Sequence, residues 1–153
     1  MADLSAILKP SSQMDEFQIQ AFLDDASIPL RLASVGSDGY PLVSSLWFTW
    51  QQGEFLCATH KSSLVARRLG ANSACGFEIA ADSMPYRGVR GQGNVVLDPQ
   101  GAAELLETLF TRYDINPASH LATWLASRSD DEYVLRIAPH WLTSWDYTER
   151  MAR

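Results

Sequence analysis

The sequence has few cysteines, little positive charge and no long hydrophobic run. Its 153 residues include two cysteines, and 12 Lys and Arg residues stand against 18 Asp and Glu residues, for a net charge of −6. A general nucleic-acid-binding protein needs a basic surface that replaces the counterions on phosphates. We therefore do not expect nucleic acid as a partner, and any phosphate site must be local.

No segment has the properties of a membrane span or a secretory signal. The longest apolar stretches, such as Pro41–Trp50, are interrupted by Ser and Thr, and they are much shorter than the roughly 20 residues of a membrane helix. The N-terminus lacks a basic region followed by an apolar one. We therefore expect a cytoplasmic protein without a membrane partner.

The cysteines and histidines give little sign of chemistry. Cys57 and Cys75 both lie in apolar, strand-like runs, and free cysteine behaves as a small hydrophobic residue in protein cores. Two buried free thiols are therefore favoured over a disulfide or a redox pair. The three histidines are far apart and have no cysteine at zinc-ligand spacing, so we expect no metal site.

The chain length, residues 1–153, is that of a single domain, since a typical domain has roughly 100–150 residues. Alternating and β-branched runs in the first half predict strands at Leu30–Val35, Pro41–Gln51 and Phe55–Thr59. Short turns containing glycine join these runs. Because parallel neighbours need a long crossover, the three strands are expected to form an antiparallel meander.

The remaining segments predict further strands at Ala74–Ala80, Tyr86–Leu97, Tyr133–Ile137 and Trp141–Tyr147, the last two separated by Pro139. Helical spacing predicts a helix over 13–25 capped by Ser12, a short one over Leu64–Leu69 capped by Ser62 or Ser63, one after Asp98 through Phe110, and one from Pro117. Six or seven antiparallel strands with helices at the connections indicate a mainly β fold. We expect a closed or split β-barrel with peripheral helices, because closure removes exposed edges.

One junction between a strand and a helix has the composition of an anion site. It contains Thr59, His60, Lys61, Ser62 and Ser63, with Arg67 and Arg68 one turn further on. Backbone N–H groups, hydroxyls, an ammonium and the positive end of a helix can converge there on a phosphate. From the residues alone, a helix cap followed by a solvated basic face is the favoured interpretation.

Several motifs follow one another in a recognisable order: Leu32–Val35, Asp38–Pro41, Leu46–Phe48, Cys57–Thr59, Ser62–Ser63, Arg67–Leu69, Phe77–Ile79 and Pro85–Gly93. This order resembles the FMN-binding split barrel of the pyridoxamine 5'-phosphate oxidase-like superfamily. The resemblance covers roughly residues 27–98 well and the C-terminal strands loosely.

The resemblance implies a homodimer that holds FMN in a groove between two barrels, contacted by both subunits. It implies that the flavin phosphate lies at Thr59, His60, Lys61, Ser62 and Ser63, with Arg67 beside them, and that the ring lies along Ser44, Ser45, Leu46 and Trp47. Gln92 and Trp145 complete the implied cofactor-binding set. Trp145 resembles a late aromatic residue that packs near the flavin from the partner subunit, although filling the dimer core is an equal alternative.

Two positions depart from true pyridoxamine 5'-phosphate oxidases. Ser44 stands where they carry an arginine, and Ser63–Val65 stands where they carry a Ser-Arg-Lys run. We therefore expect a general relative that does not oxidise pyridoxamine phosphate.

The expected function is an FMN-dependent oxidoreductase acting on a small organic substrate, because a flavin carries the redox chemistry itself. A protein nucleophile is not required, and no Ser-His-Asp or Cys-His set can be assembled from the motifs. A non-catalytic flavin-binding or storage module is the alternative, as is a deazaflavin- or haem-binding relative, since fold alone does not decide function.

Overall fold

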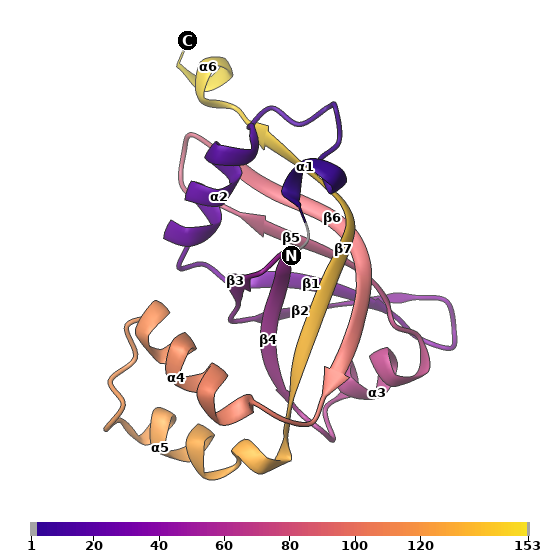
Figure 1. Ribbon diagram of the computed structural model, residues 1–153, viewed down its shortest axis with the longest axis vertical. Coiled ribbons are helices and arrows are strands. Elements are labelled where there is room, and N and C mark those ends of the chain that lie inside the picture. Colours follow the sequence, from indigo (N-terminus) through magenta and orange to yellow (C-terminus); the bar gives the residue numbers. More distant parts are fainter. Residues whose placement is uncertain (1–2, 153) are drawn as a thin grey trace.

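A computed structural model describes residues 3–152 of the chain (Figure 1). The strands are β1 (Leu30–Val35), β2 (Pro41–Leu46), β3 (Thr49–Gln51), β4 (Glu54–His60), β5 (Ala74–Ala80), β6 (Arg87–Asp98) and β7 (Glu132–Asp146). The helices are α1 (Leu4–Ile7), α2 (Glu16–Asp25), α3 (Leu64–Ala71), α4 (Ala102–Arg112), α5 (His120–Ser127) and α6 (Thr148–Met151), with a 3-10 turn η1 (Ser129–Asp131). Within residues 3–152, no helix is long and apolar enough to span a membrane.

The seven strands form one antiparallel sheet in the order β2-β1-β5-β6-β7-β4-β3. Only Trp47 and Phe48 connect the two edge strands, β2 and β3. Three peptide steps span about 11 Å at most, so the sheet must curl until its edges approach each other. Figure 1 shows this curl, with the long strands β6 and β7 bending along the sheet. The predicted mainly β split barrel is confirmed.

The prediction of one strand over Pro41–Gln51 is wrong. This segment is divided between β2 and β3, which lie at opposite edges of the sheet. The predicted three-stranded meander is also wrong, because β1 pairs with β2 and β5, whereas β4 pairs with β3 and β7. Apolar composition continues through Trp47 and Phe48, so the break comes from barrel closure and not from a local turn signal.

The last strand is longer than predicted, since β7 continues through Pro139. Its register passes from Gln92 opposite Trp141 to the next residue of β6 opposite Pro139. His140 is therefore an extra residue, which makes a β-bulge. β4 pairs with β7 only as far as Ile137, so the missing N–H of Pro139 removes no hydrogen bond from that pair.

Three helix starts differ from the prediction because other residues cap the helices. α4 begins at Ala102, after Gly101, and not directly after Asp98. α2 begins at Glu16, after Asp15, whose side chain accepts from Gln18 N at 2.8 Å in a capping box. Ser12 lies instead 2.6 Å from the hydroxyl of Ser144 and attaches the N-terminal segment to β7. α5 begins at His120, after Ser119, so the predicted start at Pro117 is too early. The short helix α3 is confirmed, with Ser63 as its cap.

The inner faces of the strands form the main core together with α2 and α3. Its buried members include Phe48, Phe55, Phe77, Leu135 and Ile137. Cys57 and Cys75 are buried there as free thiols, as predicted. α4 and α5 pack on the outer side of β4 and β7, where Leu56 and Val134 join a second cluster. Figure 1 shows these two helices side by side, at the end of the molecule opposite α6.

Candidate cofactor-binding site

The predicted phosphate loop, Thr59–Ser63, connects β4 to α3. The Thr59 hydroxyl donates to the Ser63 hydroxyl at 2.9 Å, and the Ser63 oxygen accepts from Ala66 N at 3.1 Å. His60 Nδ1 accepts from Ser62 N at 3.1 Å and lies 2.7 Å from the Ser62 hydroxyl. The loop is thus organised by its own hydroxyl, imidazole and backbone groups before any ligand enters.

Lys61 fixes this loop to the η1 turn. Its backbone N donates to Asp131 O at 2.8 Å, and its ammonium donates to Asp130 O at 2.9 Å while lying over the Tyr133 ring. An ammonium has three donors, so this contact leaves two for another acceptor. Lys61 therefore has a structural role and retains the capacity to bind an anion.

Four arginines near the predicted site could contact the flavin phosphate, namely Arg67, Arg68, Arg87 and Arg90, and their surroundings differ. Arg68 donates to Tyr40 O at 3.1 Å, Arg87 lies over the Phe22 ring, and Arg90 lies 5.1 Å from the Trp145 ring. Arg67 is exposed on α3, next to the loop, and makes no ion pair with the described residues. Arg67 is thus the one of the four that lies next to the loop with no side-chain partner among residues 3–152.

The predicted ring-binding strand residues line a cavity beneath α4 and α5, which we call the helix-covered cavity. It has a volume of about 210 Å³ and is lined by Ser45, Leu46, Trp47, Ala58, Leu106, Leu109, Leu125 and Glu132. Trp47 stacks on Tyr113 with the ring centroids 5.3 Å apart. Ser44, the fourth predicted ring-binding residue, does not line the cavity. The structure therefore brings Ser45, Leu46 and Trp47 next to Ala58, the residue before the loop.

A buried carboxylate that the sequence analysis missed belongs to the same cavity. Glu132 is 3% exposed and forms an ion pair with Arg128, with Nε and Oε1 3.1 Å apart. Burial raises the pKa of Glu132, although Arg128 and His60, its cross-strand partner, act in the opposite direction. The four-residue spacing of Arg128 and Glu132 was the only available signal in the sequence.

A second hollow, which we call the strand groove, lies on the outer side of the sheet. It has a volume of about 550 Å³ and is lined by Arg31, Ala33, Val43, Gly76, Phe77, Glu78, Arg90, Gly91, Gln92 and Trp141. Every one of these residues belongs to a strand, and the Gln92 side chain accepts from Trp141 Nε1 at 3.3 Å. Trp145 does not line the groove, although Arg90, whose guanidinium lies over the Trp145 ring, does.

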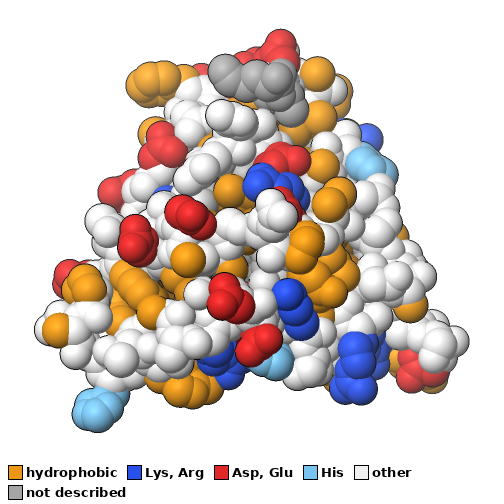
Figure 2. Space-filling model, turned by 60° about the horizontal axis from the view of Figure 1, so that its bottom comes forward, with side chains coloured by type: hydrophobic (Ala, Val, Ile, Leu, Met, Phe, Trp, Pro, Cys, Tyr) orange, Lys and Arg blue, Asp and Glu red, His pale blue; other side chains and the backbone are white. Residues whose placement is uncertain are grey.

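Ser45 connects the two hollows, because it lines the helix-covered cavity and pairs with Arg31 of the strand groove. The phosphate loop lines neither of them. Within one chain, most of the predicted site residues therefore lie in three groups: the loop with Arg67, the residues Ser45–Trp47 with Ala58, and Gln92 near Trp141. Ser44 and Trp145 line neither hollow. Figure 2 shows the molecule with the bottom of Figure 1 turned forward, a face on which hydrophobic side chains lie close to Lys and Arg side chains.

The architecture defines the fold class of the protein, which is a split barrel. Comparisons with solved structures give the same fold class. The chain is similar to the conserved hypothetical protein Rv2991 from Mycobacterium tuberculosis, with 21% identity over 94% of this chain and 92% of that one and a TM-score of 0.75. It is also similar to an F420 reductase, with 24% identity over 79% and 93% of the two chains and a TM-score of 0.62.

A third similar structure is a candidate pyridoxamine 5'-phosphate oxidase from Listeria innocua, with 17% identity over 87% and 98% of the chains and a TM-score of 0.66. HutZ, the haem storage protein from Vibrio cholerae, matches at 16% identity over 86% and 93%, with a TM-score of 0.65. No family model and no curated protein matches the chain. The expected resemblance to pyridoxamine 5'-phosphate oxidase-like split barrels is confirmed at the level of the fold.

Proposed function

We propose that two copies of this chain bind FMN along the strand groove and that the flavin exchanges hydride with a small organic substrate. The observation that carries the proposal is the strand groove itself, about 550 Å³ in volume and lined only by strand residues. An exposed sheet face of mixed apolar and charged character, here with Glu78 between Arg31 and Arg90, is typical of an interaction or ligand site. A second copy would cover it.

The side chains of the groove fit a flavin. Trp141 and Val43 offer apolar surface for a planar ring, and the Gln92 amide offers donors to its polar edge. Arg31 and Arg90 make no ion pair with the described residues and would pair with an anionic group. The bound flavin would supply the redox chemistry, while these residues orient it and exclude water.

The separation of the phosphate loop from the groove supports a site shared by two subunits. Lys61, Arg67 and the N-terminal end of α3 would hold the phosphate of a flavin whose ring lies on the partner's groove. Ser44 and Ser63–Val65 lack the cations of true pyridoxamine 5'-phosphate oxidases, so we propose a different small substrate.

Similarity to an F420 reductase favours a deazaflavin as the second candidate cofactor, and similarity to HutZ favours haem as the third. Haem iron usually takes His, Cys, Met or Tyr as its axial ligand. Among the described residues that line the strand groove, none is of these types. The groove by itself therefore supplies no axial ligand for haem, and the candidate ligand in the proposed shared site is His60 of the phosphate loop.

The test begins with the visible absorption spectrum of the purified protein and a titration of the protein with FMN. We expect a flavin spectrum and FMN fluorescence quenching that saturates at one FMN per chain. Bleaching by a nicotinamide donor and reoxidation by an added acceptor would distinguish an enzyme from a storage module. A Soret band, or an absence of FMN binding, would contradict the proposal.

A further inference from the structure

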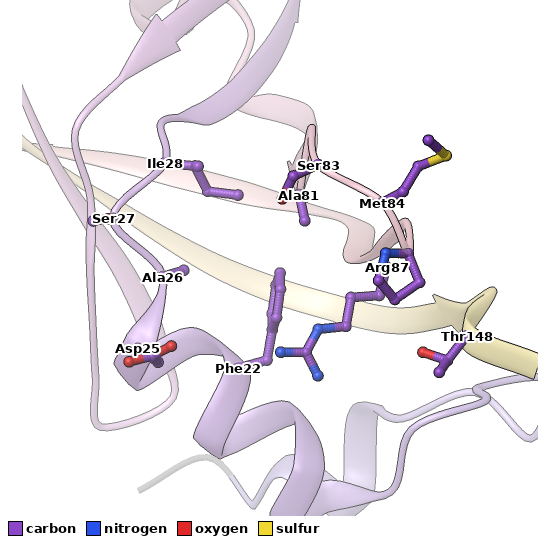
Figure 3. A pocket seen from close by; sticks show the side chains of 11 residues that line it. Phe22, Asp25, Ala26, Ser27, Ile28, Ala81, Ser83, Met84, Arg87 and Thr148 are labelled. Atoms are coloured by element: carbon purple, nitrogen blue, oxygen red, sulfur yellow. The ribbon is translucent and has the colours of Figure 1, made fainter. Parts of the chain in front are cut away.

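One cavity with no role so far lies between the end of α2, the β5–β6 loop and the start of α6, and we call it the Arg87 cavity (Figure 3). Its volume is about 390 Å³, and it is lined by Phe22, Asp25, Ala26, Ser27, Ile28, Ala81, Ser83, Met84, Pro85, Arg87 and Thr148. It shares no residue with the strand groove or the helix-covered cavity. The size is in the range of small-molecule pockets, roughly 300–1,000 Å³.

Arg87 is the only cation that lines this cavity. Its guanidinium reaches from β6 toward Phe22 and lies 5.5 Å from the ring centroid, as Figure 3 shows. Among residues 3–152, no carboxylate lies within ion-pair distance of Arg87. The carboxylate of Asp146, its cross-strand partner, accepts instead from Thr148 N at 3.0 Å.

The walls of the cavity limit the ligand to a particular kind of anion. A guanidinium binds a carboxylate or a phosphate through two parallel hydrogen bonds. Asp25 lies on the far side of the Phe22 ring from Arg87 (Figure 3) and adds a negative charge that opposes a dianion. Phe22, Ile28 and Met84 provide apolar surface, which a free inorganic anion would leave unused.

We propose that the Arg87 cavity binds a small carboxylic acid with an apolar body. The carboxylate pairs with the Arg87 guanidinium, and the body packs against Phe22 and Ile28 in place of water. This site lies apart from the proposed flavin site, and it gives the protein a second ligand class that the flavin proposal does not require.

The test uses three probes that distinguish the contribution of the carboxylate from that of the apolar body. They are 3-phenylpropionate, 3-phenyl-1-propanol, which has the same body and no charge, and inorganic phosphate, which has charge and no apolar body. Binding is followed by calorimetry and by NMR shifts of backbone amides in the full-length protein. We expect 3-phenylpropionate to bind at least tenfold more tightly than the alcohol or phosphate, with shifts at Ala81, Arg87 and Thr148. Equal binding of the alcohol or of phosphate would overturn the proposal.

Two variants locate the site and one controls for charge. Arg87→Gln is expected to weaken 3-phenylpropionate binding at least tenfold, and Ala26→Leu, which fills the cavity and retains Arg87, is expected to abolish it. Arg150→Gln removes an exposed arginine that also lies over an aromatic ring, that of Tyr147, outside the cavity, and should leave the affinity unchanged. Unchanged binding in both folded cavity variants would refute this site, and circular dichroism verifies folding.

Discussion

Helices α4 and α5 cover one half of the outer side of the barrel, over β4 and β7, and we call it the covered half. No helix within residues 3–152 lines the strand groove on the other half, which we call the open half. Beneath α4 and α5, Leu56 and Val134 are buried, and the one buried carboxylate, Glu132, has an ion-pair partner. Over the strand groove, Val43 is 63% exposed, and Arg31 makes no ion pair with the described residues. This difference is what supports the proposal that a second molecule covers the open half, whereas the half beneath α4 and α5 is packed within a single chain.

The largest expected effect concerns the Thr59–Ser63 loop, which in the proposed dimer would hold the phosphate of a flavin lying on the partner's strand groove. Replacing both Lys61 and Arg67 with Ala should weaken FMN binding, since each charge-assisted contact contributes about 1.5–3 kcal/mol. Fluorescence titration measures the change, with Arg150→Ala as a control for the loss of charge. Equal FMN affinity in the double variant and the parent would mean that the phosphate lies elsewhere.

A pair of tryptophans tests whether the two halves differ in stability. Trp47 stacks on Tyr113 under the helices, so Trp47→Ala should lower the free energy of unfolding by about 2–3 kcal/mol. Trp141 lies in the strand groove, and Trp141→Ala should cost the isolated chain less than about 1 kcal/mol. Urea denaturation of the two variants gives the comparison. Similar losses would show that the open half is as self-sufficient as the covered one.

The dimer contact is tested by placing a charge on the open half. Val43→Arg should weaken dimerisation by about 2 kcal/mol, roughly a 30-fold change in the dissociation constant, because an interface centre does not tolerate an unpaired charge. Sedimentation measures the association. Phe17→Arg is the control, since Phe17 is 83% exposed on α2 outside the groove. A monomeric parent protein, or a Val43→Arg dimer of normal affinity, would exclude the strand groove as the interface.

A smaller effect is expected for Glu132 in the covered half. Because burial raises its pKa in the folded protein, the stability that it contributes is complete below its unfolded pKa and is lost as the pH rises through its folded pKa. Glu132→Gln cannot ionise and should therefore gain stability relative to the parent between about pH 4 and pH 7. Denaturation at the two pH values measures the difference. A relative loss would show that the ion pair with Arg128 outweighs burial.

The smallest effect is a difference in thiol accessibility between the two halves. Burial raises the pKa of Cys75 to about 11 and raises the pKa of Cys57 as well. Neither native thiol should react quickly with a disulfide reagent near neutral pH, because the thiolate is the reactive form. Cys75, on β5, should react first, since it is 7% exposed and Cys57 is fully buried. Faster labelling of Cys57 would mean that the covered half opens more readily.

Much of the fold was predictable because it depends on local patterns. Alternating apolar residues and glycine-containing turns marked Leu30–Val35 and Ala74–Ala80 at their observed bounds. The short helix after Ser63 was predictable from its capping residue. The split of the Pro41–Gln51 segment was not predictable in this way, because nothing at Trp47 or Phe48 interrupts strand-forming composition.

The amino-acid sequence by itself determined most of the strands, the Ser63 cap of α3, the buried thiols and the chemical character of the Thr59–Ser63 loop, since these depend on neighbours within a few residues. Only the tertiary structure decided that β2 and β3 become opposite edges, that Glu132 meets the strand residues under α4 and α5, and that Arg31, Arg90 and Gln92 line one groove. Those neighbours are distant in the chain and become adjacent only when the sheet curls.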